Sequence, residues 1–227
     1  MKKIIVTGNS GKTLFSYFLA EHLSKDKKVV LISTDEQKAT FRCLFPNAKK
    51  TKKSLARLLS DPVITDKDIY QNASLINKRF LMITGGDYTE NFPDITTFNC
   101  VRLLTALEGI ADIVIVDSSK HIFDSFIAKA PDCTNICITT ADIRGHHFRM
   151  KEENGAINVL WQSSPYGSYQ DALTTFKEKP FELPYEKKLT AIYNGEAIKD
   201  VSVSSKYKKT LKSIAKTMEE LEVSYDV

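Results

Sequence analysis

The stretch from residue 4 to residue 13 (IIVTGNSGKT) limits the fold of this chain more than any other segment. An apolar run typical of a β-strand leads into a glycine turn, and a helical pattern begins at Lys12. Gly8 and Gly11 permit backbone angles and close approaches that a Cβ atom would block, so successive N–H groups can point at a polyphosphate near the positive end of the helix. The segment therefore predicts a phosphate-binding loop. The residues expected to bind a nucleotide there are Gly8, Asn9, Ser10, Gly11, Lys12 and Thr13.

The rest of the chain alternates between short apolar runs and helical patterns. Strands are expected at residues 29–32, 80–83, 112–117, 135–139 and 157–161, and helices at about 12–25, 54–59, 66–75, 95–107 and 205–223. Apolar strands separated by helices indicate right-handed βαβ crossovers. The predicted fold class is therefore α/β, with a doubly wound, mostly parallel sheet flanked by helices in three layers, as in the P-loop NTPase fold. With 227 residues, 42% of them hydrophobic, the chain is expected to form a single nucleotide-binding domain over residues 1–227.

Two acidic residues follow predicted strands at the sheet edge where such folds bind ligands. Asp117 ends the apolar run 113–116, and a carboxylate there is costly to bury unless a positive charge meets it. Together with the Thr13 hydroxyl it predicts a Mg²⁺ site, because magnesium bound to a nucleotide needs few protein ligands. Asp35 is predicted to position an attacking water or to complete the outer shell of the metal. The simpler interpretations are that Asp117 caps a turn and that Asp35 starts a helix.

The composition favours a cytoplasmic protein. A net charge of +4, from 32 basic and 28 acidic residues, permits an acidic or nucleotide partner without requiring a nucleic acid. No run approaches the roughly 18 apolar residues of a transmembrane helix, and the N-terminus leaves no room for the apolar segment of a signal peptide. The four cysteines are scattered and are expected to be buried free thiols. The lysine-rich run at 49–53 permits contact with DNA, although a solvated loop is the simpler interpretation.

The predicted C-terminal helix at about 205–223 is amphipathic. Its apolar residues recur at helical spacing, with lysines around the first half and acidic residues at the end. A membrane-binding helix would need cations throughout and bulky apolar residues at the tip. The acidic end therefore favours a helix that docks on the body of the protein.

Five segments carry a family resemblance that spans residue 1 to about residue 200. They are GNSGKT at 8–13, VVLISTD at 29–35, DIVIVDS at 112–118, LPYE at 183–186 and NGE at 194–196. In this order they resemble the MinD/ParA group of P-loop ATPases. The resemblance implies ATP or ADP as ligand, Mg²⁺ as cofactor, catalytic roles for Lys12 and Asp35, metal contacts through Thr13 and Asp117, and a place near the base for Pro184 and Tyr185. It also implies a nucleotide-dependent homodimer and a protein partner from a positioning, pilus or conjugation system.

The loop departs from the pattern of that family. Thr7 stands where the family carries a lysine that reaches the partner's phosphates across a dimer, Asn9 replaces a glycine, and Val6 replaces the first glycine of the strict P-loop. Asparagine tolerates left-handed backbone angles, so the turn is expected to persist. Lys38 or Lys120 could supply the missing charge. Nucleotide binding is therefore expected to survive better than hydrolysis, which needs positive charge at the transferring phosphate.

These observations leave three functions open. The leading one is a cytoplasmic ATP-binding protein, a slow ATPase whose nucleotide state controls dimerisation and the positioning of a partner. The alternative is a non-hydrolysing nucleotide-binding scaffold with a degenerate loop. A P-loop kinase or ligase for small molecules is the third, and the scattered arginines, which form no evident lid, argue against it.

Overall fold

The fold is built on an eight-stranded sheet in the order β3-β4-β2-β5-β1-β6-β7-β8. A computed structural model describes residues 1–35, 40–47, 54–85, 96–119, 122–130, 132–151, 156–161, 173–174, 176 and 178–223. The strands are β1 (Lys2–Gly8), β2 (Val29–Ser33), β3 (Ser74–Asn77), β4 (Phe80–Ile83), β5 (Ile113–Asp117), β6 (Cys133–Thr140), β7 (Ile157–Trp161) and β8 (Phe181–Leu183). Only β3 and β4 pair antiparallel among these strands. The glycine loop therefore leaves the sheet from β1, between β5 and β6.

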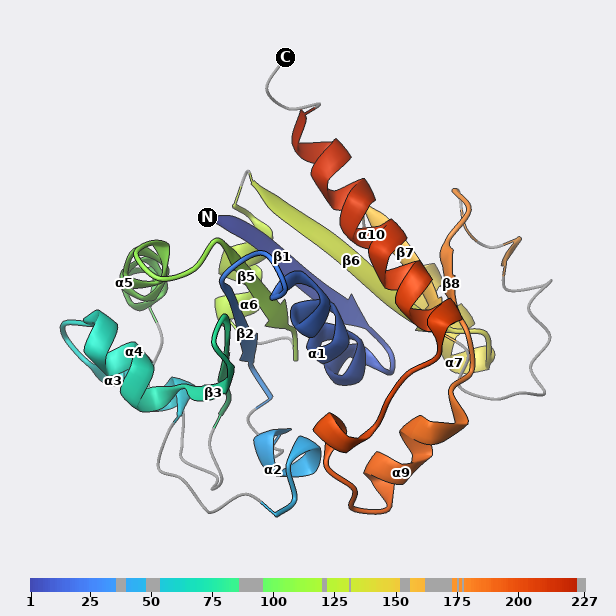
Figure 1. Cartoon of the computed structure of the whole chain (residues 1–227). Coiled ribbons are helices and arrows are strands. Elements are labelled where there is room, and N and C mark those ends of the chain that lie inside the picture. The colour runs from blue at the N-terminus through green and yellow to red at the C-terminus, as the bar shows by residue number, and fades with distance from the viewer. Residues whose placement is uncertain are drawn as a thin grey trace.

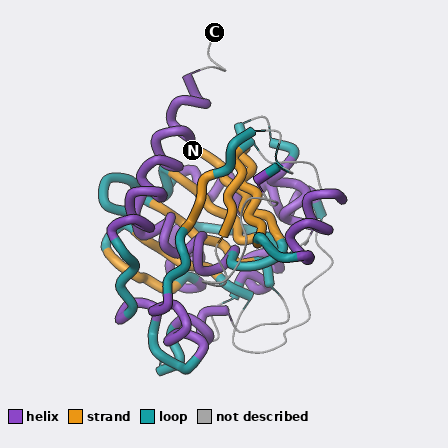
Figure 2. The backbone as a smooth tube through the Cα atoms, turned by 90° about the vertical axis from the view of Figure 1, so that its right-hand side faces the viewer, coloured by secondary structure: helices purple, strands orange, loops and turns teal. Residues whose placement is uncertain are grey.

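Helices cover both faces of the sheet, which forms the central layer in Figures 1 and 2. They are α1 (Lys12–Leu23), α2 (Thr40–Leu44), α3 (Leu55–Ser60), α4 (Asp66–Asn72), α5 (Thr97–Glu108), α6 (Ile122–Ala128), α7 (Ile143–Lys151), α9 (Thr190–Tyr193) and α10 (Ser205–Val223), with short 3-10 helices at Lys187–Leu189 and Ile198–Asp200. Alternate residues of β1 enter different cores: Ile4 and Val6 pack on the side of α1 and α10, and Ile5 packs on the side of α5 and α6. The predicted α/β class with a mostly parallel sheet is confirmed.

The prediction of one helix over residues 66–75 is wrong in its last part. Helix α4 ends at Asn72, because Ala73 adopts an extended backbone with φ −98° and ψ 152°. Leu75 then pairs with Leu81 of β4 in an antiparallel hairpin, and its side chain is 67% exposed. The apolar spacing of the segment suited a helix, but pairing with the edge of the sheet decides its structure.

Helix α10 lies against α1, as Figure 1 shows. Its apolar face is buried at Tyr207, Leu211, Ile214 and Met218. The ring of Tyr207 meets that of Phe18 edge to face, with their centroids 5.8 Å apart. The prediction of a docked C-terminal helix is therefore confirmed. Within the part of the chain that the structure describes, no helix has the length and apolarity needed to cross a membrane.

Candidate functional site

The glycine loop closes tightly against the ends of neighbouring strands. Gly8 and Gly11 have φ values of 145° and 79°, which strain any residue with a side chain. A Cβ atom on Gly8 would lie 1.9 Å from the carbonyl oxygen of Ile138, and one on Gly11 would lie 1.1 Å from the ring of Trp161. Lys12 folds back over the loop, with its Nζ 3.4 Å from the carbonyl oxygen of Gly8. Glycine is therefore required at both positions, as the sequence indicates.

The structure brings the two predicted metal ligands together. Thr13 Oγ1 donates a 2.6 Å hydrogen bond to Asp117 Oδ2, and Ser33 Oγ donates to the same oxygen at 3.3 Å. Burial raises the pKa of Asp117 to about 6, although the Thr13 bond, the charge of Lys12 and the Ser33 bond each lower it. The other carboxylate oxygen, Oδ1, is buried without a hydrogen-bond partner. A cation would satisfy that oxygen and favour the charged carboxylate.

Thr13 and Asp117 fit Mg²⁺ bound together with a nucleotide. Among the described residues, no group of three or more His, Cys, Asp or Glu side chains is arranged to hold a metal ion. Magnesium would therefore take its remaining oxygen ligands from phosphates and water. When bound, the ion supplies positive charge that neutralises the phosphate oxygens.

A cavity of about 590 Å³ opens beside the loop, a size that suits a small-molecule ligand. It brings together the predicted residues Asn9, Ser10, Gly11, Lys12, Thr13 and Asp35. Arg42 and Cys43 from α2 also line the cavity, as do Ile192 in α9 and Gly195, which follows α9. These four were not predicted as site residues. Cys43 is a free thiol and is exposed, so the expectation of four buried cysteines is wrong at this position.

Pro184 and Tyr185 follow β8 and do not line this cavity. The next residue in the same segment, Glu186, is 8% exposed and accepts hydrogen bonds from the backbone N–H (3.1 Å) and the hydroxyl of Ser204. The Ser204 hydroxyl in turn accepts a 3.2 Å hydrogen bond from the backbone N–H of Tyr207. The described contacts of this segment therefore fix the start of α10, and the role of Pro184 and Tyr185 in base binding stays a prediction.

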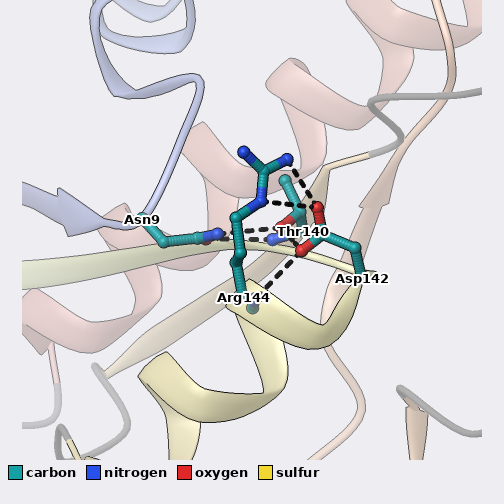
Figure 3. A network of polar contacts seen from close by, with 5 residues as sticks. Asn9, Thr140, Asp142 and Arg144 are labelled. Carbon is teal, nitrogen blue, oxygen red and sulfur yellow. Dashed lines mark hydrogen bonds and ion pairs between the residues drawn. The ribbon is translucent and has the colours of Figure 1, made fainter.

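Asn9 braces the loop against the end of β6 (Figure 3). Its Nδ2 donates to Thr140 Oγ1 at 2.8 Å, and the Thr140 backbone N–H donates to Asn9 Oδ1 at 3.1 Å. Thr140 Oγ1 also donates to Asp142 at 2.6 Å, and Arg144 donates two bonds to the same carboxylate. Burial alone would raise the pKa of Asp142, but the bonds from Thr140, Arg144 and the Gly145 N–H outweigh it and lower the pKa to about 2. Asparagine thus links the loop to β6, a role beyond its tolerance of turn geometry.

Thr7 brings no charge to the cavity. Its Oγ1 donates to Asn135 Oδ1 on β6 at 3.2 Å, and its backbone pairs within the sheet opposite Cys137. Lys38 and Lys120, the candidate replacements for the missing lysine, lie outside the described residues, as does the lysine-rich run at 49–53.

Asp124 on α6 is a further residue that sequence reasoning missed. It is 3% exposed, and its Oδ2 accepts bonds from the Thr34 hydroxyl (3.0 Å), the Ser118 hydroxyl (2.9 Å) and the Ser119 backbone N–H (2.9 Å). Thr34 precedes Asp35, and Ser118 follows Asp117. One buried carboxylate thus holds the ends of β2 and β5 together. The sequence does contain a signal for this residue, because Asp124 is an acid in the first turn of the helix that follows Asp117.

The glycine loop, the carboxylates at the strand ends and the parallel sheet define the P-loop NTPase fold. Solved structures with a similar fold include a ParA family ATPase and the cell division protein MinD. A ParA family ATPase from Chlorobium tepidum matches 94% of this chain and 98% of its own, with a TM-score of 0.74 and 14% sequence identity. The septum site-determining protein MinD of Pyrococcus horikoshii, complexed with Mg-ADP, matches 97% of both chains with a TM-score of 0.69 and 14% identity.

A third similar structure is the MinC:MinD cell division protein complex of Aquifex aeolicus, with a TM-score of 0.66, 16% identity, and coverage of 95% of this chain and 96% of that one. Identities this low show a shared fold, so the chain has the fold of these ParA and MinD proteins. No protein-family model matches the sequence, and no curated protein matches it.

Proposed function

We propose that the chain binds ATP with Mg²⁺ in the cavity beside the glycine loop and acts as a slow ATPase of the MinD/ParA type. The observation that carries this proposal is the Thr13–Asp117 pair, with one buried carboxylate oxygen left for a cation. Lys12 and the loop N–H groups would bind the phosphates, and Asp35, which lines the same cavity, would position the attacking water. The similar fold of MinD, solved with Mg-ADP, supports the choice of ligand.

In this proposal the bound nucleotide controls dimerisation and the binding of a protein partner from a positioning, pilus or conjugation system. The MinC:MinD complex among the similar structures supports a protein partner. Because Thr7 is bonded to Asn135, the loop position that carries a lysine in the family supplies no cation here. Slow turnover follows, since the transition state of phosphoryl transfer needs added positive charge. The absence of a cation at Thr7 also favours the alternative function, a non-hydrolysing nucleotide-binding scaffold.

Nucleotide binding is tested by isothermal titration of the purified protein with ATP in the presence and absence of Mg²⁺. We expect Mg²⁺-dependent binding, and about 10- to 100-fold weaker binding by Lys12→Ala, because a charged hydrogen bond to phosphate is lost. Lys67→Ala, at an exposed position on α4, is the matched control. Wild-type protein that binds no Mg-ATP contradicts the proposal.

Phosphate release and light scattering then separate the two candidates. A slow ATPase releases phosphate at a rate that Lys12→Ala reduces, and forms a dimer with a non-hydrolysable ATP analogue. A scaffold binds ATP without turnover and keeps one oligomeric state. Release that Lys12→Ala leaves unchanged removes Lys12 from the mechanism.

A further inference from the structure

A second cation lines the cavity beside Lys12. Arg42 lies on α2, the short helix that follows β2, and its side chain is half-buried. Of the described residues that line the cavity, Lys12 and Arg42 are the basic ones and Asp35 is the acidic one. Arg42 therefore brings a second positively charged group to the cavity in addition to the loop lysine.

The Arg42 side chain has an unused donor inside the protein. Its Nε atom is buried and has no hydrogen-bond partner. A buried N–H without an acceptor is unfavourable, and such groups in native proteins usually have a partner. A ligand with anionic oxygens is the kind of group that a guanidinium recognises, because its N–H donors form a planar fork that matches phosphate geometry.

A short series of contacts places α2 next to the metal ligands. Ser33 Oγ lies 3.3 Å from Asp117 Oδ2 and 3.2 Å from Thr40 Oγ1. Thr40 is the first residue of α2 and also lines the cavity. Arg42 lies two residues further along α2, and Asp117 is hydrogen-bonded to Thr13, which lines the same cavity as Thr40 and Arg42. A metal that binds there contacts the outer phosphates of a nucleotide, so these phosphates would be the ones close to α2.

We infer that Arg42 is a phosphate-binding residue that contacts the terminal phosphate of ATP from within the same chain. The inference rests on the proposed function, since it assigns a contact to the nucleotide that the cavity would hold. This contact would add positive charge for nucleotide binding from within the chain, so it requires no second copy of the chain. The expected signature is a contribution to binding that is large for ATP and small for ADP.

The test is isothermal titration with Mg-ATP and Mg-ADP on wild type, Arg42→Gln, Arg42→Lys and Arg42→Ala. Glutamine keeps much of the aliphatic stem and removes the charge, so it carries the test if the alanine variant does not fold. We expect Arg42→Gln to bind ATP about tenfold or more weakly and ADP within about threefold of wild type, with partial recovery of ATP binding in Arg42→Lys. Arg57→Ala, at an exposed position on α3, is the matched control. Thermal melting without nucleotide checks that each variant is folded.

The outcomes distinguish the two levels of the proposal. Wild type that binds neither nucleotide overturns the proposed function itself. Wild type that binds ATP, with Arg42→Gln binding it equally well, overturns the assignment of Arg42 and leaves the proposed function intact. Equal weakening of ATP and ADP binding overturns the assignment to the terminal phosphate.

Discussion

Asp117 combines deep burial with a charge that its described surroundings only partly support. It is 1% exposed, and hydrogen bonds from Thr13 and Ser33 reach only one of its two oxygens. Burial therefore dominates and raises its pKa to about 6. A group of this kind destabilises the ligand-free fold when it is ionised, and becomes favourable when a cation binds. The ionised carboxylate therefore lowers the stability of the ligand-free fold, and the metal that it is proposed to bind would offset this effect.

We predict that Asp117→Asn stabilises the nucleotide-free protein in a pH-dependent way. Well below pH 4 the carboxyl is protonated in both the folded and the unfolded chain. Because the folded pKa is the higher one, wild-type stability falls as the pH rises from about 4 to about 6, and then levels off. The gain in unfolding free energy of Asp117→Asn over wild type should be about 2–3 kcal/mol larger at pH 8 than at pH 4.

Urea denaturation at the two pH values measures this difference, with Asp26→Asn, an exposed acid, as the control. A wild-type-to-variant difference that is the same at both pH values contradicts the prediction. Asp117→Asn should also lose the stabilisation that Mg-ATP gives to the wild type, since the proposed metal ligand is gone.

The residues of the site differ in how far the sequence indicates them. Thr13 and Asp117 were predictable as a pair, because Thr13 closes the glycine-loop motif after β1, Asp117 ends the apolar run of β5, and parallel strands end at one edge of the sheet. Arg42 was not, since a five-residue helix gives no pattern that relates it to a loop some thirty positions earlier. Its place in the cavity depends on how α2 packs against α9.

Helix α6 connects two loops of the site through one side chain. Asp124 accepts bonds from the segment after β2 and from the segment after β5. The acids proposed to act on water and on the metal follow or end these same strands, so their separation depends on Asp124. We therefore assign Asp124 a positioning role, in which it acts through Asp35 and Asp117 without touching a ligand.

We predict that Asp124→Ala lowers the free energy of unfolding by about 2–4 kcal/mol, because it leaves buried donors without an acceptor. Thr34→Val, which removes one of these donors, should cost about 1 kcal/mol. Urea denaturation measures both, and Asp132→Ala is the control, since its ion pair with Lys3 is half exposed and should contribute less than about 1 kcal/mol. A positioning role also requires that Asp124→Asn, which keeps one acceptor, retains ATP binding but needs more Mg²⁺ for it. An unchanged Mg²⁺ requirement would leave Asp124 with a structural role alone.

Elements buried on both faces were the ones that sequence patterns identified well. The continuous apolar runs of β2, β4, β5 and β7 are buried along nearly their whole length, so composition and burial agree. Strand β3 was missed because it is a half-exposed edge strand of four residues. In such a strand the pairing with a neighbour decides the structure, and no pattern within the segment reports that pairing.

On the scale of the whole molecule, the two large cores formed by the described residues share one sheet, and α10 completes one of them. The face of α10 at Tyr207, Leu211, Ile214 and Met218 belongs to the same core as α1 and as Ile4 and Val6 of β1. Lys2 Nζ also donates to the carbonyl oxygen of Met218 at 2.7 Å, which ties the two ends of the described chain together. The amphipathic pattern of α10 is therefore explained by burial within the chain, and its apolar face is not available to a membrane in this structure.

We predict that Leu211→Ala lowers the unfolding free energy by about 2–5 kcal/mol, because the side chain is 2% exposed and its removal leaves a cavity in a packed core. The same substitution at Leu75, which is 67% exposed on β3, should change it by less than about 0.5 kcal/mol. Urea denaturation compares the two variants directly. Equal and small effects would mean that α10 is undocked in solution. In that event the freed apolar face should bind vesicles of anionic lipid, whereas a docked helix leaves the wild-type protein unbound in the same sedimentation assay.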